Sequence, residues 1–213
     1  SLERPRVRAK VQVLPDGMPF ALATLWGRLA VPTLVITPRP EDARRLHEQL
    51  SIWSGDEDRV LHFPETETLP FERLVSEIDT VHHRLSTLAS LCEAGAAPLV
   101  VASTVAITQK TIDRSKFEAS AHTLRKSQRL DLEETLDLWR RMGYRFEPNV
   151  DAPGLASRRG GILDIFSPDS EAPARIELWG NEIESVRLFD PVTQKSTAMV
   201  ESLTVIACQE TLP

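Results

Sequence analysis

The sequence predicts a parallel α/β domain over about residues 1–110, followed by an α+β domain with an antiparallel sheet over about residues 111–213. In the first half, short apolar runs alternate with amphipathic segments, which is typical of a parallel sheet with helices on its faces. In the second half, one helical segment is followed by strands and turns. With 213 residues, the chain is long enough for two hydrophobic cores.

Strands of the first half are expected at 33–37, 60–63 and 98–103, where the residues are apolar and rich in Val, Leu and Ile. A helix begins at Pro40, because proline is favoured in the first helical turn. A second, longer helix precedes the last of these strands. Apolar or small residues at helical spacing define the two helices: Ala43, Leu46, Leu50 and Trp53 in one, and Ile78, Val81, Leu85, Leu88 and Leu91 in the other.

In the second half, a weakly alternating strand is expected at 117–124. Asp131 is a predicted helix cap with Glu134 three residues later, as in a capping box, and Gly143 ends the helix. From residue 156 onward the chain consists of strands and turns. The helix is expected to bury Leu132, Leu136, Trp139 and Met142. Turns are predicted at Gly180 with Asn181 and at Asp190 with Pro191, and a last strand at 202–207.

The segment 158–190 is the most informative part of the sequence, because it predicts three consecutive strands. In the strand 174–179, a period of two sends Ile176 and Leu178 to a core face. The opposite face carries Arg175, Glu177 and Trp179. Arg and Trp are enriched where a partner protein buries a surface, so this pattern indicates a protein-binding face.

The same strand pattern has an alternative interpretation, in which Trp179 lies under a loop and an Arg stem covers it. Gly160 and Gly161 indicate a bulge ahead of the strand. Because a bulge interrupts the alternation, parity alone does not place Arg159 on the same face as Arg175.

Composition argues against several classes of protein. The formal net charge of −6 disfavours a domain whose main task is to hold nucleic acid through its phosphates. No window approaches the roughly 18–20 apolar residues of a membrane span, and the first residues lack the apolar region of a signal peptide. We therefore expect a cytoplasmic protein with no membrane partner. Cys92 and Cys208 fit reduced core thiols.

A parallel α/β domain raises the question of nucleotide binding. Residues 13–21, before the first helix, lack the lysine and the hydroxyl residue that a phosphate-binding loop requires, and no lysine lies between Lys10 and Lys110. ATP binding is therefore not expected, and the predicted cofactor set is empty.

Other catalytic arrangements receive no support from the sequence. His82 and His83 are adjacent on a helix and point about 100° apart, which suits a surface better than a shared metal. Asp164 and Glu177 lie on neighbouring predicted strands and could form a carboxylate pair. Asp164 is explained more simply as the polar side of an alternating strand, so no catalytic or metal site is predicted.

Four segments carry a family resemblance: Glu-Thr-Leu-Pro-Phe-Glu at 67–72, Arg-Leu-Ser-Thr-Leu at 84–88, Arg-Gly-Gly-Ile-Leu-Asp-Ile-Phe at 159–166, and the run 175–190. Together they resemble the amino-terminal module of bacterial transcription-repair coupling factors, which is itself similar to the excinuclease protein UvrB. The resemblance covers nearly the whole chain from about Thr33. It implies that the first domain is a degenerate form of the P-loop helicase type.

Two departures separate this chain from UvrB. UvrB has a working P-loop and a long hairpin that clamps damaged DNA, whereas here 13–21 has no P-loop and 67–76 leaves no room for the hairpin. The coupling factors lack both features, so the resemblance favours them.

The resemblance implies a non-catalytic adaptor that recruits the excinuclease protein UvrA to stalled RNA polymerase in nucleotide excision repair. By matching motif positions, Arg159, Arg175 and Trp179 would carry the contact, with Glu177 as a charged neighbour. Trp179 stands where the family usually has Phe. The chain itself is expected to be monomeric, and other domains of a full-length ATP-dependent DNA translocase would engage RNA polymerase and DNA.

Two rival functions stay open from the residues. One is a fragment of an ATP-dependent, damage-verifying repair helicase of the UvrB kind, which the missing P-loop disfavours. The other is a nonspecific DNA-binding domain, which the acidic charge disfavours.

Overall fold

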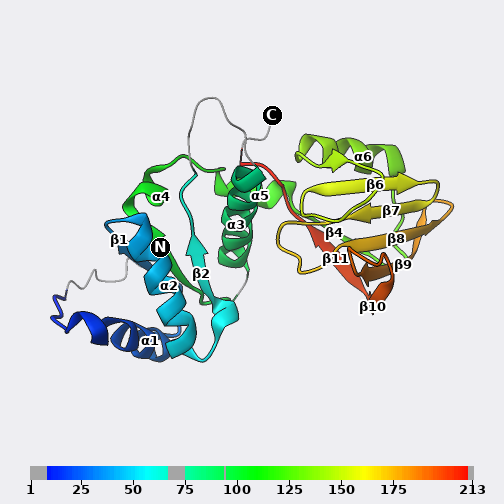
Figure 1. Ribbon diagram of the computed structural model, residues 1–213. Coiled ribbons are helices and arrows are strands. Elements are labelled where there is room, and N and C mark those ends of the chain that lie inside the picture. Colours follow the sequence, from blue (N-terminus) through cyan, green and yellow to red (C-terminus); the bar gives the residue numbers. More distant parts are fainter. Residues whose placement is uncertain (1–8, 67–74, 94, 211–213) are drawn as a thin grey trace, which may run out of the picture.

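The computed structural model describes residues 9–66, 75–93 and 95–210. It has a three-stranded parallel sheet in the first half and two sheets in the second half, one with six strands and one with two (Figure 1). The predicted mixed architecture, parallel first and mainly antiparallel second, is confirmed. The boundary near residue 110 stays a prediction. The resemblance motif at 67–72 and most of the segment 67–76 lie outside the described residues.

The parallel sheet has the strand order β1-β3-β2, so β3 is central and buried at every position. The bounds are β1 Thr33–Thr37, β2 Val60–Phe63 and β3 Leu99–Ser103. The helical elements are η1 Pro15–Gly17, α1 Met18–Leu29, α2 Pro40–Ser54, η2 Glu57–Arg59, α3 Val75–Cys92 and α4 Thr104–Thr108. Residues of α1 and α2 share one core cluster with β2 and β3.

Two expectations for the first half were wrong in detail. The buried stripe of α2 comprises Ala43, Leu46 and Leu50 and stops before Trp53, which is 56% exposed and packs edge-on against Phe20 of α1. The strand β1 lies at the sheet edge, and its side chains Leu34 and Ile36 are exposed rather than covered by a helix.

The second half begins with a helix where a strand was expected. Residues 114–120 form α5 (Arg114–Ser120), and only the last part of 117–124 is strand, in β4 (His122–Arg125). The carboxylate of Asp113 accepts a hydrogen bond from the backbone N–H of Ser115 at 2.9 Å and caps the helix. Phe117 and Ser120 are buried at a spacing of three, which suits a helix.

The predicted helix after Asp131 and the predicted strands are present, whereas the strands at 145–146 and 196–200 were not predicted and the last strand ends at Val205 rather than at 207. Asp131 caps α6 (Leu132–Arg141) by accepting from the N–H of Glu134 at 3.0 Å, and Gly143 follows the helix with φ of 95°. The six-stranded sheet has the order β10-β9-β8-β7-β6-β5, and β11 pairs with β4. The bounds are β5 Arg145–Phe146, β6 Leu155–Arg159, β7 Ile162–Ile165, β8 Ala174–Trp179, β9 Glu182–Phe189, β10 Ser196–Val200 and β11 Ser202–Val205.

One face of the six-stranded sheet packs on α6 and on the β4–β11 pair. The core there includes Trp139, Leu136 and Met142 from the helix, as predicted, together with Leu163 and Ile176 from the sheet. Because Leu163 and Ile176 are cross-strand partners, their neighbours in sequence point to the other face. That other face is where the predicted binding residues lie.

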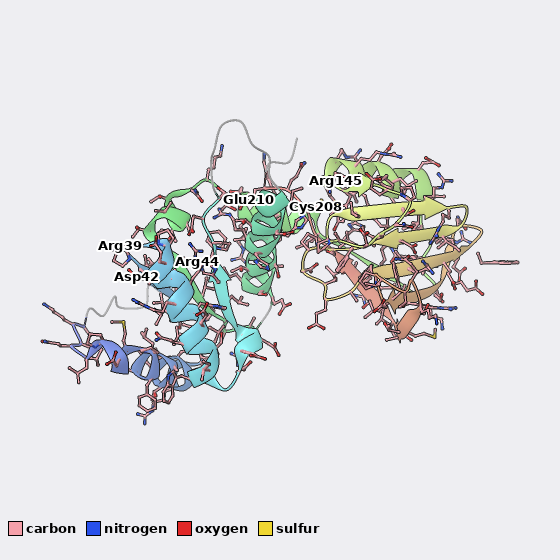
Figure 2. All side chains as sticks on the ribbon, viewed as in Figure 1. Arg39, Asp42, Arg44, Arg145, Cys208 and Glu210 are labelled. Atoms are coloured by element: carbon pink, nitrogen blue, oxygen red, sulfur yellow. The ribbon has the colours of Figure 1, made fainter. Side chains whose placement is uncertain are left out.

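The two halves meet through α3 and the segment after β11, near α5 (Figure 1). Arg84 of α3 is fully buried, and its Nε donates to the carboxylate of Glu210 at 2.8 Å; Glu210 lies beside α3 (Figure 2). The hydroxyl of Thr111 donates to the same carboxylate at 2.8 Å. The Arg84 guanidinium also donates to the carbonyl of Pro64 and lies 4.1 Å from the ring centroid of Phe63.

His82 is also buried at this junction, contrary to the expectation of a surface position, whereas His83 is exposed. A Cβ placed on Gly154 would lie 2.9 Å from the His82 ring, so the loop before β6 approaches α3 closely. Burial lowers the pKa of His82. The tertiary contact with Gly154, which no helical period reveals, is the reason the expectation failed.

The Arg84–Glu210 pair should be important for stability. Replacing Glu210 with Ala leaves the buried guanidinium of Arg84 without its carboxylate, so we expect a loss of about 3–5 kcal/mol in the free energy of unfolding, measured by urea denaturation. Glu118→Ala is the matched control, because the Arg114–Glu118 pair has the same Nε–Oε1 distance of 2.8 Å but is solvent-exposed. The control should behave like the unmodified chain. Equal effects of the two changes would contradict a special role for the buried pair.

Candidate protein-binding face

The candidate site lies on the sheet face opposite the main core. We call it the charged face, and it comprises Arg159, Asp164, Arg175, Glu177, Ser185 and Arg187 on β6, β7, β8 and β9. The register pairs Asp164 with Arg175 and Arg175 with Arg187, which forms one row across three strands. A second row pairs Ile162 with Glu177 and Glu177 with Ser185. At one end, the same face is covered by a small apolar cluster that includes Phe189.

Arg159 joins this face through a tight turn. Gly160 and Gly161 were expected to form a bulge, but they form the two-residue connection of a hairpin, since Arg159 pairs directly with Ile162. Gly160 has φ of 62°, a conformation that glycine adopts without strain. Because a regular hairpin preserves the alternation, Arg159 shares its face with Asp164, which strand parity alone had left open.

Asp164 is the centre of the hydrogen bonding. Its carboxylate is 2% exposed and accepts three N–H groups. Arg175 donates from Nε at 2.7 Å and from Nη2 at 2.9 Å, and Arg159 donates from Nη2 at 2.6 Å. The Arg175 guanidinium also lies 4.8 Å from the ring centroid of Phe189. The hydrogen bonds that Arg175 donates to Asp164 raise the pKa of Arg175, so this guanidinium stays charged at any physiological pH.

A second ion pair involves Glu177, whose carboxylate lies 2.9 Å from Arg187 Nη2 and accepts a hydrogen bond from the Ser185 hydroxyl at 2.7 Å. Asp164 therefore pairs with Arg159 and Arg175, whereas Glu177 pairs with Arg187, and the two carboxylates do not form a carboxylate pair. Arg187 was not among the predicted site residues, although the alternation of 186–189 would have placed it on this face. Its Nε is buried and forms no hydrogen bond with any residue that the structure describes.

Trp179 lies at the end of β8, just before the turn at Gly180 and Asn181. It is 80% exposed, so the alternative in which a loop buries it is wrong. A register shift between Glu177 and Leu178 separates Trp179 from the regular part of the strand. The structure thus brings Arg159, Arg175 and Glu177 together on one face and leaves Trp179 open to solvent two residues beyond Glu177.

The first half has a cavity of about 530 Å³ between η1, α1, β1 and α2, beside the segment 13–21. Asp16 and Asp42 line it, and Arg45 already donates to Asp42 at 2.9 Å; Asp42 lies in the first turn of α2 (Figure 2). The cavity wall thus has two carboxylates and one arginine that is already paired. This lining disfavours binding of a polyphosphate, which needs free cations and backbone N–H donors.

The described part of the chain offers two further findings about ligands. Across residues 9–66, 75–93 and 95–210, His, Cys, Asp and Glu side chains do not form any group of three or more that could hold a metal ion. The helices of that same part are all too short or too polar to cross a membrane.

Comparisons with known proteins agree with the motifs. Residues 123–210 match the family described as the UvrB interaction domain. The chain is 32% identical over 216 residues to the transcription-repair-coupling factor of Myxococcus xanthus, covering 97% of this chain and 18% of the relative. It is 30% identical over 189 residues to that of Escherichia coli, covering 89% and 16%, and 31% identical over 180 residues to that of Bacillus subtilis, covering 84% and 15%.

The chain spans less than a fifth of the length of these curated relatives. The resemblance predicted from the motifs is confirmed: the chain is similar over most of its length to one part of the transcription-repair-coupling factors, and residues 123–210 match the UvrB interaction domain family.

Proposed function

We propose that this chain is a non-catalytic adaptor that binds the excinuclease protein UvrA through the charged face and Trp179. In a longer protein it would bring the excision-repair machinery to a stalled RNA polymerase, while other domains translocate on DNA with ATP. The observation that supports this most is the grouping of Arg159, Arg175 and Glu177 on one sheet face, with Trp179 exposed on the same strand as Arg175 and Glu177.

The chemistry of these residues suits a protein partner. A Trp that is 80% exposed leaves a large apolar surface in water, and burying it under a partner would recover that hydrophobic free energy. Arg159 is held by Asp164 but its side chain is still 52% exposed, so its guanidinium has N–H groups left to donate. An exposed aromatic together with oriented arginines on one sheet is the composition typical of an interface centre.

We further propose that residues 1–110 form one domain, a degenerate P-loop-helicase type that has lost nucleotide binding, and that residues 111–213 form the partner-binding domain. The three-stranded parallel sheet supports the first assignment, as does the cavity beside 13–21 with Asp16 and Asp42 in its wall. The same cavity chemistry argues against the rival function, an ATP-dependent repair helicase of the UvrB kind.

The first test concerns the aromatic anchor. Trp179→Ala should weaken binding to UvrA by about 2 kcal/mol or more, roughly 30-fold in Kd, because Trp is a residue type that dominates interface energies. Folding should change by less than about 0.5 kcal/mol, since Trp179 is exposed. Titration calorimetry and urea denaturation of the same sample measure both quantities. Trp53→Ala is the matched control, because Trp53 is also exposed but lies in the first half. Unchanged affinity of Trp179→Ala would refute the anchor.

A second test concerns nucleotide. We expect millimolar ATP with magnesium to leave the melting temperature unchanged, because the cavity beside 13–21 presents carboxylates and a paired arginine. A ligand present at 100 times its Kd would stabilise the fold by about 2.7 kcal/mol and raise Tm by several degrees. A shift of that size would show that the site is functional and would revive the helicase alternative.

The third test concerns DNA. With a net charge of −6, the chain should bind duplex DNA with a Kd at or above ~100 µM at physiological salt. Fluorescence anisotropy over a series of salt concentrations measures both the affinity and its salt dependence. Micromolar binding with a steep salt dependence would support the nonspecific DNA-binding function instead.

A further inference from the structure

We infer that Asp164 is the positioning residue of the charged face, a buried carboxylate that sets the guanidinium groups of Arg159 and Arg175 in the arrangement that meets the partner. This inference rests on the proposed binding of UvrA, and it assigns a role to a residue that makes no contact with the partner itself. Its basis is the combination of burial, hydrogen-bond geometry and the exposure of the two arginines.

The geometry fixes both cations from one carboxylate. Arg175 approaches Asp164 in a two-point contact, Nε to Oδ1 and Nη2 to Oδ2, which fixes the plane of the guanidinium as well as its distance. Arg159 reaches Oδ2 from the other side, at 2.6 Å. Because Asp164 is 2% exposed and is paired with Arg175 across β7 and β8, the carboxylate itself has little freedom to move.

The exposure of the two arginines distinguishes a role of Asp164 in positioning them from a role in stabilising the fold alone. The side chain of Arg175 is 17% exposed, but that of Arg159 is 52% exposed. An ion pair that served only the fold would need no exposed second cation. One carboxylate cannot neutralise two guanidinium groups, so the group of Asp164, Arg159 and Arg175 keeps a net positive charge. Asp164 sets the positions of the guanidinium groups that carry this charge.

Because Asp164 already holds Arg159 before binding, association loses less side-chain entropy. Ordering one long, flexible side chain at an interface costs about 0.5–1.5 kcal/mol, which corresponds to roughly 2- to 12-fold in Kd. Loss of the Asp164 carboxylate should therefore weaken binding by about 2- to 12-fold through Arg159, and further if Arg175 also changes its orientation.

The experiment measures UvrA affinity for the whole chain with Asp164→Asn, which keeps the shape of the side chain and removes its charge. We expect Kd to rise at least 2-fold for the folded fraction, which a denaturation curve of the same sample defines. Glu133→Gln is the matched control: Glu133 accepts from Arg158 at 2.7 Å, but this pair is exposed and Arg158 points to the opposite face of the sheet from Arg159. The control should change Kd by less than 2-fold.

A double-mutant cycle with Arg159→Ala separates positioning from a general effect on the fold. If Asp164 acts through Arg159, Asp164→Asn should cost clearly less affinity in the Arg159→Ala background than in the unmodified chain. An equal cost in both backgrounds would overturn the positioning of Arg159, and an unchanged Kd or tighter binding by Asp164→Asn would overturn the positioning role as a whole. Should Asp164→Asn fail to fold, Asp164→Glu carries the same cycle, because it retains the charge and displaces the carboxylate, and the same criteria apply.

The outcomes also separate this inference from the function on which it rests. If the unmodified chain does not bind UvrA, the proposed function fails, and the positioning role fails with it. If Arg159→Ala and Trp179→Ala weaken binding but Asp164→Asn does not, the function stands and only the role of Asp164 is lost.

Discussion

The charged face depends on the pairing register of β6, β7, β8 and β9. Side chains alternate between the two faces of a sheet, so a slip of one residue would send Asp164 and Arg175 into the core and Leu163 and Ile176 into solvent. Two short hairpin turns limit such slippage, and each contains a glycine with positive φ, Gly160 at 62° and Gly180 at 64°. The apolar residues of the core face therefore determine the arrangement of charges on the other face.

A buried carboxylate on an outer sheet face carries a desolvation penalty. Removing Asp164 from water is unfavourable, and the three N–H donors of Arg159 and Arg175 offset this cost without necessarily adding net stability. Arg175 and Arg187 are like charges directly opposite each other, which is also unfavourable, and each forms an ion pair with its own carboxylate, Arg175 with Asp164 and Arg187 with Glu177. Such a network defines geometry more than it contributes to stability, which fits a surface that must match a partner.

The sequence predicted those parts of the site that depend on short-range alternation. Arg175 and Glu177 lie on the regular part of β8, so a period of two was sufficient to group them, whereas Trp179 lies beyond the register shift between Glu177 and Leu178. Arg159 could not be placed in the same way, because a glycine pair fits both a bulge and a hairpin turn, and only the pairing with the next strand decides between them. Burial of His82 likewise depends on a tertiary contact that the helical pattern does not contain.

On the proposed function, the junction of the two halves gives a reason for a parallel α/β half that binds no nucleotide. The segment after β11 is held from both sides: the Tyr144 hydroxyl donates to the carbonyl of Ile206 at 2.8 Å, and the N–H of Cys208 donates to the carbonyl of Met142. On the other side, Ile206 packs in the α3 cluster and Arg84 binds Glu210. The strand β11 leads directly into this segment and pairs with β4, and both strands contribute to the core under the six-stranded sheet. The contacts of α3 with the segment after β11 therefore connect α3 to the core that supports the charged face. On the proposed function, the first half attaches the second through this junction, and that task requires its helices and sheet but no phosphate-binding loop.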